Sequence, residues 1–297
     1  MSYIEKKHFV FIGGDNRQQF IKEYLLNHYG SSFCFTDLTS SNSLSTNEIL
    51  SLIEQGNVII APLPITSDGI CISIPSNEDK TTKLVPFNGM IERLRPDSII
   101  FAGGFTPNMS ATMSVKGIRF YDYLTSRCVQ TKNAIATAEG TIMKAIENSI
   151  VNIHSSDCLI LGFGKCAKVL AAKFSALNAN VTICARSDYS LCEAFTCGYN
   201  TIHLEKLSSI IKDYDYVINT IPAMVLEACT LDKLTKKTLI IDIASKPGGI
   251  DYDYANKNNL NTIHYLGIPG KVSPKTSGYI LGEYITDCLT KGHRMEE

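Results

Sequence analysis

Short apolar runs of β-strand length alternate with helix-like segments along almost the whole chain. Strand-like runs lie at 8–12, 33–36, 57–60, 98–102, 118–121, 157–161, 181–184, 201–204, 216–219, 239–243 and 262–265. Strands that alternate with helices form βαβ units, in which parallel strands build one sheet with helices on its faces. The pattern therefore predicts an α/β fold with two doubly wound parallel sheets in series.

The chain length and one long periodic segment indicate where the two sheets are joined. At 297 residues the chain suits two domains of ordinary size. Isoleucines at helical spacing within 129–148 predict a connecting helix there. The expected domains are an N-terminal substrate domain of flavodoxin or Rossmann type at 1–128 and a second α/β domain at 149–274. A final helix at 275–291 is expected to pack back onto the first domain, and Pro274 suits its start.

Composition excludes several classes of function. The formal net charge of −1 gives no electrostatic footprint for nucleic acid or an anionic membrane. No apolar run reaches bilayer-spanning length, and the N-terminus lacks the features of a signal peptide. The ten cysteines form no C-x-x-C pair, so we expect Cys34, Cys158 and Cys184 to be small buried hydrophobes in a reducing cytoplasm. The histidines show no metal-ligand spacing, and no metal site is expected.

The stretch "CLILGFGKCAKVLAAKF" at 158–174 carries a dinucleotide fingerprint. Gly162, Gly164 and Ala167 form G-x-G-x-x-A between a predicted strand and an amphipathic helix. The first glycine permits the tight turn, and the second lets the backbone approach a pyrophosphate. Lys165 and Cys166 open the helix, whose free N–H groups and dipole favour phosphate. We predict a Rossmann dinucleotide site here.

The end of the next strand indicates which dinucleotide binds. Arg186 and Ser187 stand 22 and 23 residues after Gly164, where an NAD site usually has an acidic residue. An arginine there accommodates a 2′-phosphate, so the prediction is NADP. The alternative, that Arg186 is an ordinary solvated residue, stays open.

Two further loops follow the fourth and fifth strands of the second sheet. They carry Asn219, Thr220 and Pro222 in "INTIPA" and Ser245 in "DIASKPGG". Ligands bind outside the carboxyl ends of strands in such sheets, so both loops are expected to face the cofactor. Ordinary turn chemistry would explain the prolines and glycines equally well.

Glu139 lies on the predicted connecting helix among apolar neighbours. Its i±3 and i±4 positions hold Ile135, Ala136, Ile142 and Met143, and none of them is basic. A carboxylate in an apolar stripe is costly unless it is paired or its pKa is raised. We therefore predict general acid–base work or substrate positioning by Glu139 at the junction of the domains. A glutamate at the edge of the stripe that reaches solvent is the alternative.

The stretch "FVFIGGDNRQQF" at 9–20 imitates a second nucleotide-binding unit. With Gly13 as the first fingerprint glycine, Asp15 falls where the second glycine is needed and Gln18 at the third position. Asp15 brings a side chain and a negative charge to the pyrophosphate position, so no dinucleotide is expected there, although Asp37 imitates an NAD-type acid. Arg17, a cation in the first helical turn, suits capture of a substrate carboxylate instead.

The final helix offers a second cation of this kind. Lys275 stands in its first turn against the helix dipole, which an anion at that place would explain, and Thr276 could add a hydrogen bond. A solvated lysine remains the alternative. Ser76 and Asn77, in a long loop at 64–80 after the third strand, are weaker candidates for the substrate.

Eight short motifs occur in a characteristic order over nearly the whole chain. They are "GGDNRQ", "SNE", "AEGTIM", "LGFGKCA", "CARS", "NTIP", "ASKPGG" and "PGKVSPKTSG". Together they make the chain resemble the A subunits of dipicolinate synthase. The resemblance implies oxidation of a lysine-pathway dihydrodipicolinate to dipicolinate with NADP, in the cytoplasm of the mother cell of a spore-forming bacterium. It also implies a heteromeric complex with a flavoprotein-like B subunit.

Residues and resemblance combine into one hypothesis, with two alternatives. A dicarboxylate substrate would be held by Arg17 and Lys275, a hydride would pass to NADP, and Glu139 would assist proton removal or orient the ring. An NADP-dependent 2-hydroxyacid or amino-acid dehydrogenase shares the two-domain plan. Its arginine and acid–histidine pair are not evident, although Lys246 stands where the arginine might be. A non-catalytic cofactor-binding subunit would keep the same fingerprint.

Overall fold

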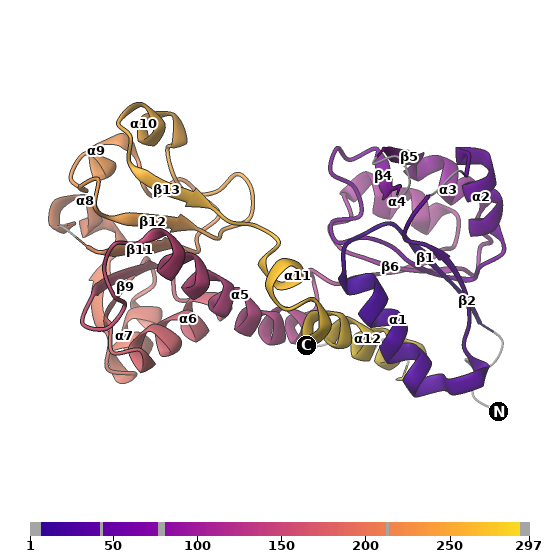
Figure 1. Ribbon diagram of the computed structural model, residues 1–297, viewed down its shortest axis with the longest axis horizontal. Helices are drawn as coiled ribbons and strands as arrows, with labels where there is room; N and C mark the ends of the chain where they lie inside the picture. Colours follow the sequence, from indigo (N-terminus) through magenta and orange to yellow (C-terminus); the bar gives the residue numbers. More distant parts are fainter. Residues whose placement is uncertain (1–6, 42–43, 77–80, 212–213, 292–297) are drawn as a thin grey trace. The chain divides into compact units, whose positions relative to one another are not determined.

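The chain forms two compact units. The computed structural model describes residues 7–41, 44–76, 81–211 and 214–291. One unit consists of Met1–Gln130 and Ser273–Glu297, and the other of Thr131–Val272. Helix α5 (Arg127–Asn148) begins in the first unit and continues into the second. Each unit has a central sheet with helices on both faces (Figure 1).

The first unit is built on a five-stranded parallel sheet. Its strands, in the spatial order β2-β1-β3-β6-β7, follow the flavodoxin-like order 2-1-3-4-5. They are β1 (His8–Ile12), β2 (Cys34–Leu38), β3 (Val58–Ile60), β6 (Ile99–Ala102) and β7 (Arg119–Asp122). The predicted doubly wound sheet is confirmed in this unit.

Alternating side chains of these strands pack into two hydrophobic cores, one on each face of the sheet. Val10 and Ile12 face α2, α3 and α4, whereas Phe9 and Phe11 face α1 and the C-terminal helix α12. The helices are α1 (Arg17–Tyr29), the 3₁₀ turn η1 (Gly30–Ser32), α2 (Thr46–Glu54), α3 (Phe87–Arg93), α4 (Pro107–Val115) and α12 (Pro274–Lys291). A capping box defines the start of α2, because the Ser45 side chain accepts from the backbone N–H of Glu48 and the Glu48 carboxylate from that of Ser45.

Helix α12 packs along α1 through two glycines. A Cβ at Gly278 would lie 2.6 Å from Phe20 Cβ and 2.9 Å from the carbonyl oxygen of Arg17. At Gly282 it would lie 2.6 Å from the Tyr24 ring. The four-residue spacing puts both glycines on one helical face and lets the two backbones approach closely (Figure 1).

Two expectations for this unit need correction. The segment expected to be one loop at 64–80 contains β4 (Cys71–Pro75), which pairs with β5 (Thr82–Pro86) in an antiparallel hairpin. Ile72 and Ile74 alternate into the core, so a period-two pattern was present between turn residues. Cys34 is exposed rather than buried, because β2 is the edge strand.

The second unit is built on a six-stranded parallel sheet. Its spatial order β10-β9-β8-β11-β12-β13 corresponds to the Rossmann order 3-2-1-4-5-6. The strands are β8 (Asp157–Leu161), β9 (Asn180–Ala185), β10 (Asn200–His203), β11 (Tyr216–Asn219), β12 (Leu239–Asp242) and β13 (Asn261–His264). The predicted Rossmann topology is confirmed.

Helices cover both faces of this sheet as well. Cys158 and Ile160 pack with α5, α6 and α7, whereas Leu159 and Leu161 pack with the elements around α8, α9 and α10 (Figure 1). The remaining elements are α6 (Lys165–Ala176), α7 (Asp188–Thr196), η2 (Leu204–Lys206), α8 (Leu207–Ile210), α9 (Ala228–Leu231), α10 (Tyr252–Lys257) and α11 (Ile268–Val272). No described helix has the length and hydropathy needed to cross a bilayer.

Candidate functional site

The turn between β8 and α6 requires a glycine at its first fingerprint position, both for its backbone conformation and for its packing against the turn after β11. Gly162 has a φ of +94°, a conformation that favours glycine. A Cβ there would also lie 2.5 Å from Thr220 Oγ1 and 3.1 Å from Ile221 Cγ1. Thr220 itself is anchored, since its hydroxyl donates to the carbonyl of Leu161 at 2.8 Å. The turn after β11 is therefore packed directly on the fingerprint turn.

Neither backbone conformation nor a neighbouring described residue requires a glycine at the second fingerprint position, Gly164. Gly164 has extended backbone with a φ of −83°, and no heavy atom lies within 4 Å of a Cβ built on it. The space beside Gly164 lies at the N-terminus of α6, where no side chain caps the helix and no acidic residue occurs in the first turn. An anion can use those N–H groups and the positive end of the dipole. The residues present thus fit a pyrophosphate.

The next fingerprint positions lie on the first turn of α6. Lys165 is exposed, whereas Ala167 is fully buried against the sheet, in agreement with its packing role. Burial raises the pKa of the Cys166 thiol, which outweighs a hydrogen bond from Thr137 that lowers it. Cys166 is therefore a protonated thiol at neutral pH.

The end of β9 presents the two residues predicted to meet a 2′-phosphate. Both Arg186 and Ser187 are exposed. The Ser187 hydroxyl accepts from the backbone N–H of Ser190 at 3.4 Å and caps α7. The Arg186 carbonyl lies 3.0 Å from His203 Nε2, which gives that histidine a structural role. Among the described residues, the Arg186 guanidinium makes no hydrogen bond or ion pair, so it is available to an anion.

A buried carboxylate, which the sequence did not single out, holds the two loops after β11 and β12. Asp242 is fully buried at the end of β12. Its Oδ1 accepts from Asn219 Nδ2 and the Ala244 N–H, both at 2.9 Å. Its Oδ2 accepts from the Gly249 N–H at 2.9 Å and the Tyr252 hydroxyl at 2.8 Å. One side chain therefore organises the whole "DIASKPGG" loop and ties it to β11.

The buried position of Asn219 corrects one prediction. Asn219 is fully buried, and its amide also donates to the carbonyl of Ile221 while its Oδ1 accepts from the Ile221 N–H, both at 3.0 Å. The predicted direct contact of Asn219 with the cofactor is wrong, because its two amide hydrogens are already used within the protein. Its neighbours at the carboxyl edge differ: Thr220 is partly exposed, and Pro222 and Ser245 are exposed.

The predicted environment of Glu139 is also wrong. Its carboxylate is half exposed and forms an ion pair with Lys173 of α6 at 3.0 Å. The buried face of α5 in this unit is made of small residues such as Ala138 and Ala145, whereas Ile146 is 63% exposed. Glu139 therefore does not lie in an apolar stripe, and the structure gives no support for acid–base work by it.

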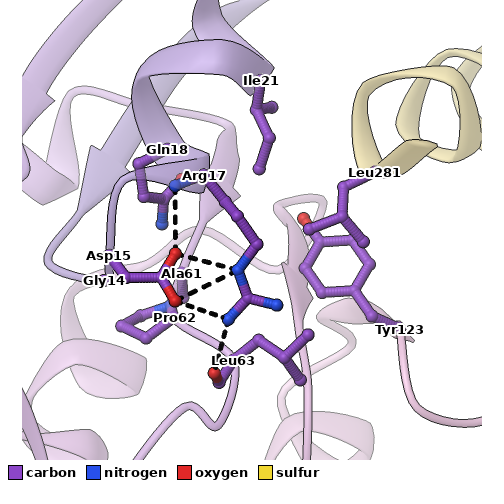
Figure 2. A pocket seen from close by; sticks show the side chains of 10 residues that line it. All are labelled: Gly14, Asp15, Arg17, Gln18, Ile21, Ala61, Pro62, Leu63, Tyr123 and Leu281. Atoms are coloured by element: carbon purple, nitrogen blue, oxygen red, sulfur yellow. Dashed lines mark hydrogen bonds and ion pairs between the residues drawn. The ribbon is translucent and has the colours of Figure 1, made fainter. Parts of the chain in front are cut away.

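In the first unit, Arg17 and Asp15 form one ion pair at the carboxyl edge of the sheet (Figure 2). Arg17 Nε lies 2.8 and 3.1 Å from the two Asp15 oxygens, and Nη2 lies 2.7 Å from Oδ2. Nη2 also donates to the carbonyl of Leu63 at 3.0 Å. Burial of Asp15 would raise its carboxyl pKa, but the hydrogen bonds and charge of Arg17 outweigh it and hold that pKa below its usual value. The predicted carboxylate anchor thus already holds a carboxylate of its own chain.

Lys275 likewise forms an ion pair within the first unit. Its ammonium lies 3.3 Å from Glu23, and the Tyr279 hydroxyl donates to the same carboxylate oxygen at 2.6 Å. The hydrogen bond and charge of Glu23 raise the Lys275 pKa. The paired acid, rather than a bound anion, can therefore account for this cation near the start of α12.

The other residues predicted to bind the substrate form no cluster among the described residues. Thr276 is exposed, Ser76 is buried, and Asn77 falls outside the described residues. Asp37 forms an ion pair with Lys22 of α1. Across the described part of the chain, no cluster of His, Cys, Asp and Glu could hold a metal ion.

Comparisons with known proteins match both units. The model of the N-terminal domain of the dipicolinate synthase A subunit matches residues 8–124, and that of shikimate / quinate 5-dehydrogenase matches residues 144–265. The dipicolinate synthase A subunit of Bacillus subtilis (strain 168) is 33% identical over 288 residues, which are 94% of this chain and 95% of that protein.

Solved structures agree with this match. The crystal structure of the dipicolinate synthase A subunit from Bacillus halodurans is 29% identical with a TM-score of 0.83, over 97% of this chain and 99% of that one. A transhydrogenase from Sinorhizobium meliloti is 15% identical with a TM-score of 0.66, over 95% and 94% of the two chains. The second likeness shows the fold alone.

Proposed function

The chain belongs to the family of dipicolinate synthase A subunits, and from this we propose that it oxidises a dihydrodipicolinate to dipicolinate with NADP. The reaction removes a hydride and a proton from the ring; NADP, when bound, would accept the hydride, and the proton would pass to water. The two carboxylates of the substrate take no part in the redox step. They are the groups by which a protein can hold and orient the ring.

The observation that carries the proposal is the open space at Gly164. None of the residues that the structure describes requires a glycine there, and the uncapped N-terminus of α6 lies beside the space. A pyrophosphate close to this backbone supplies the missing reason for the glycine. In the proposed complex the exposed guanidinium of Arg186 and the hydroxyl of Ser187 meet the 2′-phosphate. Asp242 keeps the loops with Thr220 and Ser245 in place.

The wider setting follows from the family. The relatives are named as one subunit of a synthase, which supports a complex of this chain with a partner subunit. We propose that this partner is the flavoprotein-like B subunit, and that the complex works in the cytoplasm of a sporulating mother cell on a substrate from the lysine pathway. Arg17 and Lys275 remain the proposed anchors for the substrate, in addition to the internal carboxylates of Asp15 and Glu23 that they already bind.

A substitution at Gly164 tests the cofactor site directly. Gly164→Ala adds a methyl group where the protein has room, so the fold should be unchanged while NADP binding weakens at least tenfold. Gly89→Ala is the matched control, because a Cβ there meets no described atom closer than 3.7 Å and Gly89 belongs to the other unit of the chain. Titration calorimetry measures the dissociation constant, and thermal unfolding checks the fold. Equal NADP affinity of the Gly164→Ala variant and wild type would contradict the proposed site.

Two further measurements address the dinucleotide and the reaction. Arg186→Asp should shift binding from NADP towards NAD, and an unchanged preference would show that the 2′-phosphate lies elsewhere. Formation of NADPH from freshly prepared dihydrodipicolinate is then followed with the chain alone and with its partner. Turnover by the chain alone excludes a merely cofactor-binding subunit. NADP binding without turnover in either preparation would contradict the synthase proposal.

A further inference from the structure

A small pocket lies beneath the "GGDNR" turn of the first unit (Figure 2). Its walls come from the residues that follow β1, β3 and β7, together with Leu281 of α12. About 10 Å³ is open to the centre of a water molecule, which is room for a single oxygen atom of that size. Four side chains bring polar groups to this otherwise apolar pocket: Asp15, Arg17, Gln18 and Tyr123.

Arg17 supplies a donor that the ion pair with Asp15 does not use. Nε and Nη2 bind Asp15 and the carbonyl of Leu63, whereas Nη1 has no partner among the described residues. The guanidinium is fixed in place, since the side chain is only 8% exposed. Figure 2 shows Nη1 turned towards the side of the pocket where Tyr123 lies. A rigid, charged donor thus faces the pocket.

Tyr123 supplies a second donor at the end of β7. Its side chain is 1% exposed, and its hydroxyl has no hydrogen-bond partner in the described structure. Burial raises the pKa of this hydroxyl well above its usual value, so it stays protonated and can donate. A buried hydroxyl without a partner is costly to the fold, and a ligand acceptor would remove that cost.

Two hydrogen-bond acceptors, on Gln18 and Asp15, limit where an anion can lie in the pocket. Gln18 Nε2 is directed to the carbonyls of Ile12 and Ile60, which leaves Oε1 as an acceptor that repels an anionic oxygen. Asp15 is 45% exposed and can turn its carboxylate into solvent, whereas Arg17 is buried. An anion is therefore favoured on the Arg17 and Tyr123 side, in competition with Asp15.

We infer that this pocket binds one carboxylate oxygen of the ligand, between Arg17 Nη1 and the Tyr123 hydroxyl. The identity of the ligand, a pyridine dicarboxylate or its dihydro form, rests on the proposed function. Tyr123 is thereby a substrate-binding residue in addition to Arg17. Asp15 stays paired with Nε and Nη2, and its negative charge beside the guanidinium opposes the binding of an anion at Nη1.

The test is titration of the full-length protein with dipicolinate, the stable product, and separately with malonate. Tyr123→Phe removes one donor to a charged acceptor and should weaken dipicolinate binding about tenfold, with NADP affinity unchanged. Tyr29→Phe is the matched control, because it removes a buried hydroxyl at the far end of α1 and should leave dipicolinate binding as in wild type. Asp15→Asn removes the competing charge at a half-exposed position and should tighten binding severalfold. This variant also decides the matter if Tyr123→Phe does not fold.

The outcomes separate the pocket from the proposed function. Unchanged dipicolinate affinity in a folded Tyr123→Phe protein, or weaker affinity in Asp15→Asn, overturns the pocket and leaves the cofactor proposal intact. Malonate binding that Tyr123→Phe weakens, without any dipicolinate binding by wild type, supports the pocket and contradicts the proposed substrate. If wild type binds neither acid, the pocket is overturned, and the Gly164→Ala titration judges the cofactor site independently.

Discussion

Asp242→Asn is the most informative single substitution in the second unit. It keeps the shape of the side chain but replaces one acceptor oxygen with an NH₂ group. At the Oδ1 position that group would face two fixed donors, from Asn219 and Ala244. At Oδ2 it would face the Gly249 N–H and the Tyr252 hydroxyl. Because the hydroxyl can rotate and accept, the second orientation is less costly, and the Gly249 N–H alone loses its acceptor.

The loss of stability follows from these four hydrogen bonds. An orphaned buried donor costs about 1–3 kcal/mol, and the bonds that remain are no longer charge-assisted. We therefore expect the free energy of unfolding of the unit to fall by about 2–4 kcal/mol. At about 2–4 °C per kcal/mol for a unit of this size, that corresponds to a melting temperature lower by roughly 4–16 °C. The dissociation constant for NADP should also rise, because both loops lose their common anchor.

Thermal unfolding by calorimetry measures the effect, with NADP titration well below the transition. Asp253→Asn is the matched control, since it removes the same charge from an exposed position one residue after Tyr252. Its effect should stay within about 1 kcal/mol. Stability of Asp242→Asn equal to that of wild type, or above it, would refute the prediction. The cost of burying the carboxylate would then exceed what its hydrogen bonds contribute.

Two further predictions concern the first unit. The pKa of Asp15 is lowered in the folded state, so its stabilisation is complete above the unfolded pKa and is lost as pH falls through the folded one. The urea midpoint of wild type should therefore exceed that of Asp15→Asn by a constant amount above about pH 5, and this advantage should shrink as pH falls below the unfolded pKa of about 3.9. A difference in midpoint that is independent of pH down to acid unfolding would contradict the ion pair. Gly278→Ala should lower the free energy of unfolding by about 1–3 kcal/mol, because its Cβ meets α1 at 2.6 Å, whereas Gly89→Ala should not, as comparison of their urea curves will show.

The strand pattern was predictable because each buried parallel strand is a continuous apolar run. The same rule explains the missed hairpin, since in "CISIP" only Ile72 and Ile74 are buried and turn residues surround them. Periodicity also identified the helix α5, but of the three isoleucines at helical spacing only Ile142 packs on the core, and the fully buried positions of this face are small residues such as Ala138 and Ala145. The distance between a helix and the sheet decides which side chains fit between them, and the spacing of residues along the helix does not reveal that distance.

Partners distant in sequence account for the errors at the site. Glu139 was judged by neighbours on its own helix, while its partner Lys173 lies 34 residues further along the chain. Asp242 occupied an ordinary position at a strand end, and only the folded loop brings four donors to it. By contrast, Asp15 and Arg17 are only two residues apart, so local sequence contains this ion pair as well as the obstacle that Asp15 presents to a phosphate.

The two glycine turns of the chain show how one local structure can serve different ligands. A Cβ at Gly13 would lie 2.4 Å from the carbonyl of Ser73, so the β4–β5 hairpin packs on the first turn. The corresponding glycine of the second turn, Gly162, is closed in the same way, whereas the space beside Gly164, two residues later, is open. In the first turn Asp15 takes the place of Gly164, and its carboxylate accepts hydrogen bonds from the Arg17 side chain and from the first backbone N–H of α1. Local sequence makes both turns, and the residue at the second fingerprint position decides whether the helix N-terminus is left open, as at Gly164, or already holds a carboxylate of its own chain, as at Asp15.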